Sequence, residues 1–148
     1  MQSLLYLLAF GAGVVLIVQV GVNSTLREAV GNAGVAALIS FVIGSAGLLV
    51  FLLLTRAPWP DRAQLAAGPA WAWLGGLLGA FYVVSTILVG PRLGAAALLA
   101  LIVLGQLVTS LLVDHFGWLG FPEHPLTPLR LLGALLLFGG MLLIVHRG

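Results

Sequence analysis

Residues 35–54 read VAALISFVIGSAGLLVFLLL, a run of about 20 residues without a charged side chain. A helix of this length spans about 30 Å, which is the thickness of the hydrocarbon core of a bilayer. Because lipid cannot hydrogen-bond exposed backbone groups, a spanning segment must be a helix or a strand of a closed barrel. The run is continuously apolar instead of alternating, so it predicts a transmembrane helix.

Four further apolar runs have the same character, and the composition agrees with them. Of the 148 residues, 61% are hydrophobic and 7% are charged, and the mean hydropathy is +1.21. A soluble domain carries about 25% charged residues. We therefore predict an all-α integral membrane protein with five transmembrane helices in a single domain over residues 1–148. The predicted helices cover approximately residues 4–27, 35–54, 71–89, 95–113 and 129–145.

Glycines and prolines mark the expected connections. Residues 31–34 and 90–94 are predicted to be tight turns, and 114–127 is a proline-containing loop. Between the second and third helices, Asp61 is expected to cap one or two helical turns that end at Ala67. The first apolar run lacks a basic leader and a small-residue cleavage site, so we expect it to be retained as a helix.

Several classes of chemistry find no support in the sequence. The absence of cysteine excludes thiol, disulfide and cysteine–metal chemistry. Six scattered arginines without lysine are not a nucleic-acid surface, and the three histidines lack the spaced partners of a metal site. Neither a phosphate-binding glycine loop nor a nucleophile elbow is present. We expect neither an enzyme nor a cofactor.

The arginines divide evenly between the two membrane sides. If the helices alternate, three lie on the amino-terminal side and three on the other side. They are Arg56, Arg62 and Arg130 against Arg27, Arg92 and Arg147. The positive-inside rule needs an excess on one side, so the tie predicts insertion in both orientations. The alternative is a small bias from a boundary shifted by one residue or from the free amino group.

Two of the predicted helices carry a polar residue at every fourth position, which places each set on one helical face. The sets are Gln19, Asn23 and Arg27 in the first helix, and Gln106, Ser110 and Asp114 in the fourth. Polar side chains within a membrane helix face the bundle interior or a wet cavity. They indicate either a substrate path or hydrogen bonds between helices, which contribute about 0.6 kcal/mol on average.

The charged members of these sets lie near helix ends, where their role is a gate or an ordinary interfacial anchor. Only an inverted second copy would bring an Arg27 and an Asp114 to the same membrane face. In the third helix, Tyr82 and Ser85 are candidates for the path, although Tyr82 equally suits a core aromatic. Small residues four positions apart, such as Ser40 and Gly44, predict close helix packing.

Several motifs together resemble a known family. They are QVGVNSTLR at 19–27, WLGGLLGAFYV at 73–83, PRLGAA at 91–96, GQ at 105–106, DHFG at 114–117, RLLG at 130–133 and GG at 139–140. This combination is similar to the YdcZ-type family, a five-helix branch of the drug/metabolite transporter superfamily. The resemblance covers nearly the whole chain.

The resemblance implies a bacterial inner-membrane protein in which a five-helix unit, equivalent to half of an EamA-like transporter, pairs with a second unit. Because the helix count is odd, two fused units in larger relatives are automatically inverted. A lone unit with balanced charges would reach the same arrangement as an antiparallel homodimer. We therefore predict a secondary transporter or facilitator of small solutes, whose partners are the lipid bilayer, a second copy and the solute. The predicted path between protomers is lined by Gln19, Asn23, Tyr82, Ser85, Gln106 and Ser110.

Two other functions stay open at this stage. The chain could be a structural or accessory membrane subunit without its own path, whereas a channel is disfavoured because charged rings are absent. Small multidrug exporters of the same superfamily exchange protons through a glutamate in their first helix. Here Gln19 and Asn23 do not titrate, which favours a neutral or zwitterionic polar solute.

Overall fold

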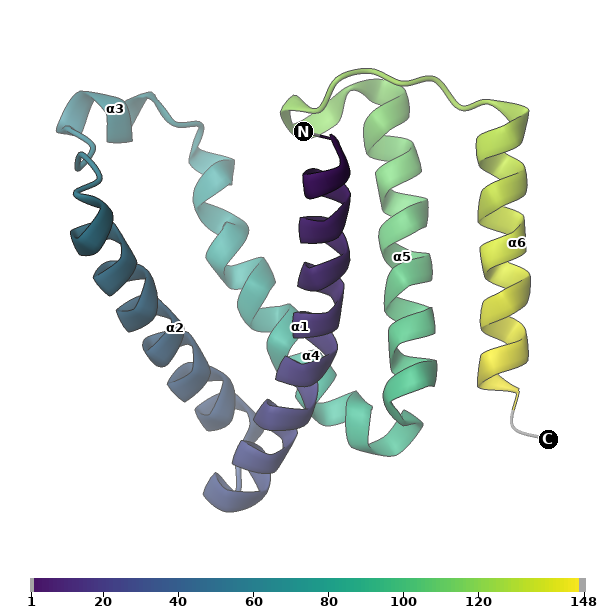
Figure 1. The fold of residues 1–148 in the computed structure, drawn as a ribbon, viewed down its shortest axis with the longest axis horizontal. Coiled ribbons are helices and arrows are strands. Elements are labelled where there is room, and N and C mark those ends of the chain that lie inside the picture. Colours follow the sequence, from purple (N-terminus) through teal and green to yellow (C-terminus); the bar gives the residue numbers. More distant parts are fainter. Residues whose placement is uncertain (1, 147–148) are drawn as a thin grey trace. The chain divides into compact units, whose positions relative to one another are not determined.

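The computed structural model describes residues 2–146, and every regular element within them is a helix (Figure 1). Five segments in this range are long and apolar enough to cross a membrane, which confirms the predicted fold class. The segment bounds are α1 Gln2–Val30, α2 Ala33–Thr55, η1 Ala70–Leu74 with α4 Gly75–Leu93, α5 Ala95–Phe116 and α6 Pro128–Val145. Two short elements, α3 Arg62–Ala67 and η2 Trp118–Gly120, lie in the connections.

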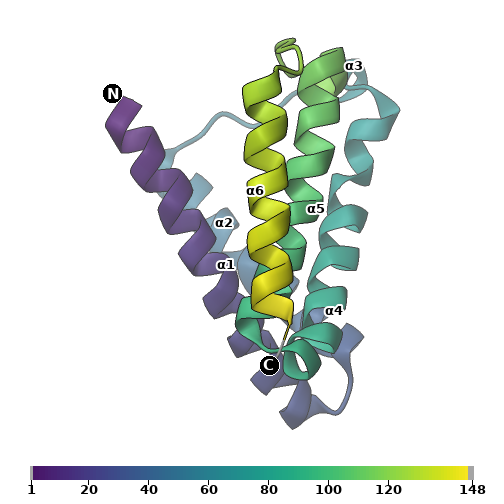
Figure 2. The same ribbon diagram turned by 90° about the vertical axis from the view of Figure 1, so that its right-hand side faces the viewer.

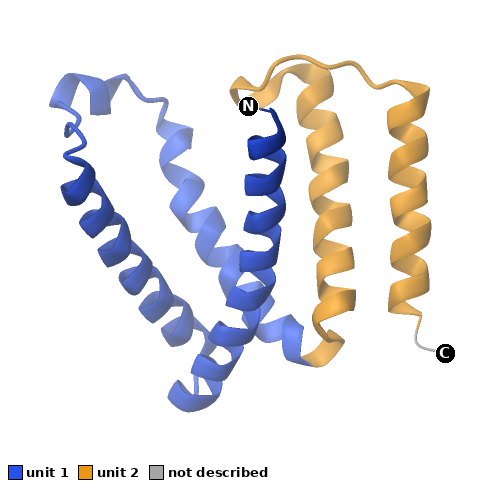
Figure 3. Cartoon of the chain, in the orientation of Figure 1, with its two compact units in different colours: residues 1–91 blue, residues 92–148 orange. Residues whose placement is uncertain are grey.

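The chain groups into two compact units, which Figure 3 distinguishes by colour. The first unit ends at Pro91 and contains α1, α2, α3, η1 and most of α4. The second begins at Arg92 and contains α5, η2 and α6. Arg147, one of the six arginines in the charge count, lies outside the described residues.

A tight turn joins α1 to α2, and α1 packs along α2. Gly31 has a φ of 76°, a conformation that glycine adopts without steric cost. Asn32 then caps α2, because its side-chain oxygen accepts a hydrogen bond from the Val35 amide at 3.1 Å. The predicted turn over 31–34 is therefore shorter than expected, since α2 already begins at Ala33.

The core of the first unit consists mainly of small residues where α2 meets α4. Ala33, Ala36 and Ala37 at the start of α2 form a buried cluster with Val83 and Ile87 of α4. Ala36 and Ile87 are 0% exposed. Because the alanine side chains are small, the larger Val83 and Ile87 of α4 pack directly on this end of α2. Beyond this cluster, α2 is exposed from Phe41 to Thr55.

The connection from α2 to α4 follows the expected caps. Arg56 adopts a left-handed conformation, and the backbone bond from Ala57 N to Leu52 O, 3.1 Å long, closes the end of α2. Asp61 and Gln64 form a reciprocal capping box at α3, which confirms the predicted cap. The third span then begins as a 3₁₀ helix, η1, before it continues as α4.

The expected turn over residues 90–94 is wrong in its extent. Helix α4 continues through Pro91 to Leu93, and the chain reverses only at Gly94. Proline suits this place because its φ is helical and only one hydrogen bond of the last turn is lost. Gly94 has φ 81° and ψ 158°, a backbone region that is essentially restricted to glycine.

The second unit is a hairpin of α5 and α6, which lie side by side in Figures 1 and 2. Helix α5 ends at Phe116 and is capped by Gly117, whose φ is 61°. Thr127 caps α6 through its hydroxyl, which accepts a hydrogen bond from the Arg130 amide at 3.3 Å, and Pro128 occupies the first turn. An apolar groove of about 370 Å³ runs between the helices; it is lined by Ala96, Leu99, Ala100, Val103, Leu137, Gly140, Met141 and Ile144.

Candidate functional site

A cleft of about 320 Å³ lies among α1, α2 and α4 of the first unit. Its position follows from the packing described above, because the alanine cluster holds only the start of α2 against α4. Gly44 lies at the middle of α2, so the cleft is near the midplane of a membrane that this helix spans. The lining residues are Gln19, Ser40, Phe41, Gly44, Ser45, Leu48 and Val83.

One wall of the cleft depends on a glycine of α4. A Cβ atom built at Gly79 would lie 3.6 Å from Cζ of Phe41, so the phenyl ring rests close to the α4 backbone. Gly75 and Gly76, one turn earlier, have no neighbouring atom within 4 Å of such a Cβ. Of these three glycines, Gly79 is the one that lies next to a side chain of α2. Ser40 and Gly44, which predicted a packing face, instead line the cleft.

The polar side chains of the cleft differ from the threonines of the same unit. The hydroxyl of Thr25 donates to Gly21 O at 3.1 Å, and that of Thr86 donates to Val83 O at 2.9 Å. Gln19, Ser40 and Ser45 have no such bond to any residue of 2–146. A polar group without a partner is costly in hydrocarbon. These three side chains are therefore available to water, to a solute or to another chain.

Asn23 lies one turn after Gln19 on α1 and is only 3% exposed. Leu26, three residues further along the same helix, packs against the alanine cluster. Within residues 2–146 the Asn23 amide has no hydrogen bond, yet no side-chain N or O atom there is both fully enclosed and unbonded. The amide thus keeps a narrow access to its surroundings. It is a buried polar group that a bound molecule or water would satisfy.

The remaining predicted path residues lie elsewhere. Tyr82 is partly buried and packs against the alanine cluster of α2 and α4, the environment expected of a core aromatic. Ser85 is partly buried on α4. Gln106 and Ser110 are exposed on α5 and belong to the second unit. Ser110 follows Ala96 and Val103 at seven-residue spacing, so it shares their helical face. That Gln106 and Ser110 line the same path as Gln19 stays a prediction.

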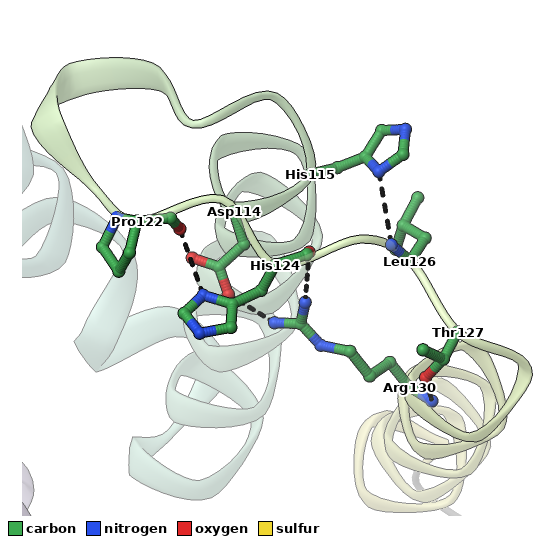
Figure 4. A network of polar contacts seen from close by, with 7 residues as sticks. All are labelled: Asp114, His115, Pro122, His124, Leu126, Thr127 and Arg130. Carbon is green, nitrogen blue, oxygen red and sulfur yellow. Dashed lines mark hydrogen bonds and ion pairs between the residues drawn. The ribbon is translucent and has the colours of Figure 1, made fainter.

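The polar groups at the loop end of the second unit form a network (Figure 4). Asp114, in the last turn of α5, makes an ion pair with Arg130 in the first turn of α6. The second guanidinium nitrogen of Arg130 donates to His124 O at 2.7 Å, and His124 N donates to Asp114 O at 2.7 Å. Arg130 therefore ties both helices to their loop. Both charged residues flank this loop in the sequence, which is the signal that could have predicted the pair.

Two histidines complete this network through the backbone. His115 Nδ1 accepts a hydrogen bond from Leu126 N at 3.2 Å, so the proton of its neutral ring is on Nε2. His124 Nδ1 lies 3.1 Å from Pro122 O and must donate to it, because a carbonyl only accepts. Among residues 2–146, histidines and acidic residues form no group that could hold a metal ion. The histidines thus fasten the loop.

The two predicted gate charges differ in their surroundings. Asp114 has its counter-ion, Arg130, within its own chain. Arg27 is partly buried in the last turn of α1 and forms no ion pair with any residue of 2–146. An inverted copy would bring Arg27 toward an aspartate that is already paired. The intermolecular pairing of these residues stays a prediction, with Arg130 as a competitor.

Comparison with known proteins identifies the family. A family model described as "Putative inner membrane exporter, YdcZ" matches residues 4–143. The inner membrane protein YdcZ of Escherichia coli strain K12 is 30% identical over 148 residues, which cover 99% of this chain and 97% of that protein. The chain belongs to the YdcZ family. No solved structure matches it.

Membership of the YdcZ family confirms the resemblance drawn from the sequence motifs. It also confirms a multi-pass protein of the inner membrane, in agreement with the five apolar spans. The family is described as one of membrane exporters and not of enzymes, which agrees with the absence of a recognisable catalytic motif. The cleft among α1, α2 and α4 and the Asp114–Arg130 network are thus features of a YdcZ-family membrane protein.

Proposed function

We propose that this YdcZ-family protein is a secondary transporter or facilitator of small solutes and that the cleft among α1, α2 and α4 is part of its path. The observation that carries the proposal is the set of unbonded polar side chains, Gln19, Ser40 and Ser45, at the middle of the membrane. In an accessory subunit without a path, the same groups would have to be bonded by helices of a partner chain. Asn23, buried one turn away, extends the polar surface along α1.

The working unit in this proposal is a pair of copies in opposite orientations. The even division of arginines removes a preferred orientation, and an inverted pair has the symmetry of many transporters. Gln106 and Ser110 on α5 have no hydrogen bond to any residue of 2–146. In the pair they are the candidates for the wall contributed by the second unit.

Export is tested by untargeted mass spectrometry of the medium of bacteria that express the protein. Wild type should enrich at least one small solute, and Gln19→Ala or Asn23→Ala should abolish that enrichment while protein abundance stays unchanged. Gln2→Ala is the matched control, since Gln2 is an exposed glutamine at the start of the same helix. Enrichment that is equal in wild type and in Gln19→Ala would refute the path and favour an accessory subunit.

Orientation is tested separately. The chain has no cysteine, so a single cysteine in each connection can be labelled with a membrane-impermeant maleimide in intact and in opened cells. An inverted pair requires that about half of the molecules react from each side at every connection. Labelling from one side only would exclude insertion in both orientations.

A further inference from the structure

The cleft among α1, α2 and α4 offers hydrogen bonds of one kind. The Gln19 amide and the Ser40 and Ser45 hydroxyls each donate as well as accept. None of them carries a charge at any physiological pH. A head group that itself both donates and accepts, such as an amide or an alcohol, can use both the donors and the acceptors of these side chains.

The rest of the cleft is apolar. Phe41, Leu48 and Val83 line it together with the polar groups, and the Phe41 ring rests near the backbone of Gly79. Val83 is buried, whereas Phe41 and Leu48 are exposed, so the cleft is open and covers only part of a ligand. Its apolar walls favour an aromatic ring or a branched aliphatic group. The volume of about 320 Å³ is at the lower limit of the range of about 300–1,000 Å³ for small-molecule sites.

The charged residues of the membrane-spanning helices lie away from this cleft. Within residues 2–146 those of α1, α4, α5 and α6 occur only in a first or last turn, and α2 has none. An ionised solute at the middle of the membrane requires a nearby counter-ion. The lining of the cleft contains no counter-ion, so a cation or an anion would carry an uncompensated charge and neither charge of a zwitterion would have a partner on the protein. This narrows the neutral or zwitterionic solute expected from the sequence to an uncharged one.

We infer that the cleft binds uncharged amphipathic molecules, each with one amide or hydroxyl head held by Gln19, Ser40 and Ser45 and one apolar body held by Phe41, Leu48 and Val83. The inference rests on the proposed function, and it names the class of solute that the path accepts. Binding in this site is indifferent to the protonation of any side chain that lines it.

Four probes with the same ring test this inference: benzamide, benzoate, benzylammonium and zwitterionic phenylglycine. The variant Leu48→Cys places a thiol on the cleft wall of a chain without cysteine, and the rate of its reaction with a maleimide is measured in detergent micelles. Benzamide should slow the reaction at least threefold, and the three charged probes should leave it unchanged. The matched control is Leu54→Cys, which lies on the same helix outside the cleft and should react at the same rate with every probe.

A second variant tests whether the slowing of the maleimide reaction by benzamide, here called protection, depends on the polar groups of the cleft. In the Leu48→Cys background, Gln19→Leu should remove the effect of benzamide, and Gln19→Asn should retain part of it. Equal or stronger protection by a charged probe, protection that survives Gln19→Leu, or no protection by benzamide would overturn the inference. These results are independent of export, because a path for charged solutes would fail here and still pass the mass-spectrometry test.

Discussion

The polar network at the loop of the second unit and the polar cleft of the first unit differ in whether their side chains are bonded within the chain. In the second unit, Asp114, His115, His124 and Arg130 bond to one another and to the backbone where α5 and α6 meet their loop. In the first unit, Gln19, Ser40 and Ser45 line a cleft at mid-membrane without partners among the described residues.

The difference separates polar groups that hold the fold from polar groups that are left free. A bonded network at a helix end holds the loop to the two helices. An unbonded amide or hydroxyl in hydrocarbon contributes nothing to stability and has a cost until something binds it. We therefore expect substitutions in the two units to affect stability and transport differently.

The largest effect should come from the alanine cluster that shapes the cleft. Ala36→Leu adds three carbon atoms to a side chain with 0% exposure and should lower the free energy of unfolding by about 3 kcal/mol. Denaturation with sodium dodecyl sulfate measures this. Ala46→Leu is the matched control, because Ala46 is exposed on the same helix and should tolerate leucine. An equal loss in both variants would contradict the close packing of α2 on α4.

Gly94→Ala should cause the next largest decrease in the free energy of unfolding. The φ of 81° and ψ of 158° at Gly94 would be strained for alanine, at a cost of about 2 kcal/mol. The same unfolding titration measures the loss. Gly47→Ala, in the exposed middle of α2 where a Cβ meets no atom, should be neutral or stabilising. A neutral Gly94→Ala would show that α4 and α5 join by another turn.

Removal of the ion pair should have a smaller effect. Asp114→Ala should cost about 1 kcal/mol, because the pair with Arg130 is only partly buried and screening by solvent weakens it. A double-mutant cycle with Arg130→Ala measures the coupling. Glu123→Ala in the same loop is the control, since Glu123 is exposed and forms no ion pair within residues 2–146. A coupling of zero would remove the contrast between the two units.

The smallest effect on stability should come from the cleft itself. Ser45→Ala removes a hydroxyl without a partner among the described residues and should change the free energy of unfolding by less than about 0.5 kcal/mol. Export of the solute should nevertheless decrease. Thermal denaturation of the purified variant and the export assay in bacteria that express it measure the two quantities. A decrease in the free energy of unfolding well above about 0.5 kcal/mol would mean that the Ser45 hydroxyl has a structural hydrogen bond.

Sequence patterns predicted the elements of this protein better than the site. The five apolar runs became the five spans, since length and hydropathy alone decide what crosses a bilayer. The polar stripe on α1 includes Gln19, which lines the cleft, and its role in a path stays a prediction. Ser40 was assigned to packing and Ser45 received no assignment, because a serine in an apolar helix has the same local pattern whether it is bonded or free.

The sequence by itself therefore determined the membrane class, the number of spans, the absence of charge along the middle of each span and membership of the YdcZ family. These properties depend only on the length, hydropathy and motifs of segments that are continuous in the sequence. Only the tertiary structure decided that Phe41 meets Gly79, that Asp114 pairs with Arg130 and that Gln19 shares a cleft with Ser40 and Ser45. Such contacts depend on how helices distant in sequence approach one another, and the side-chain bonds among them also require a specific distance and direction.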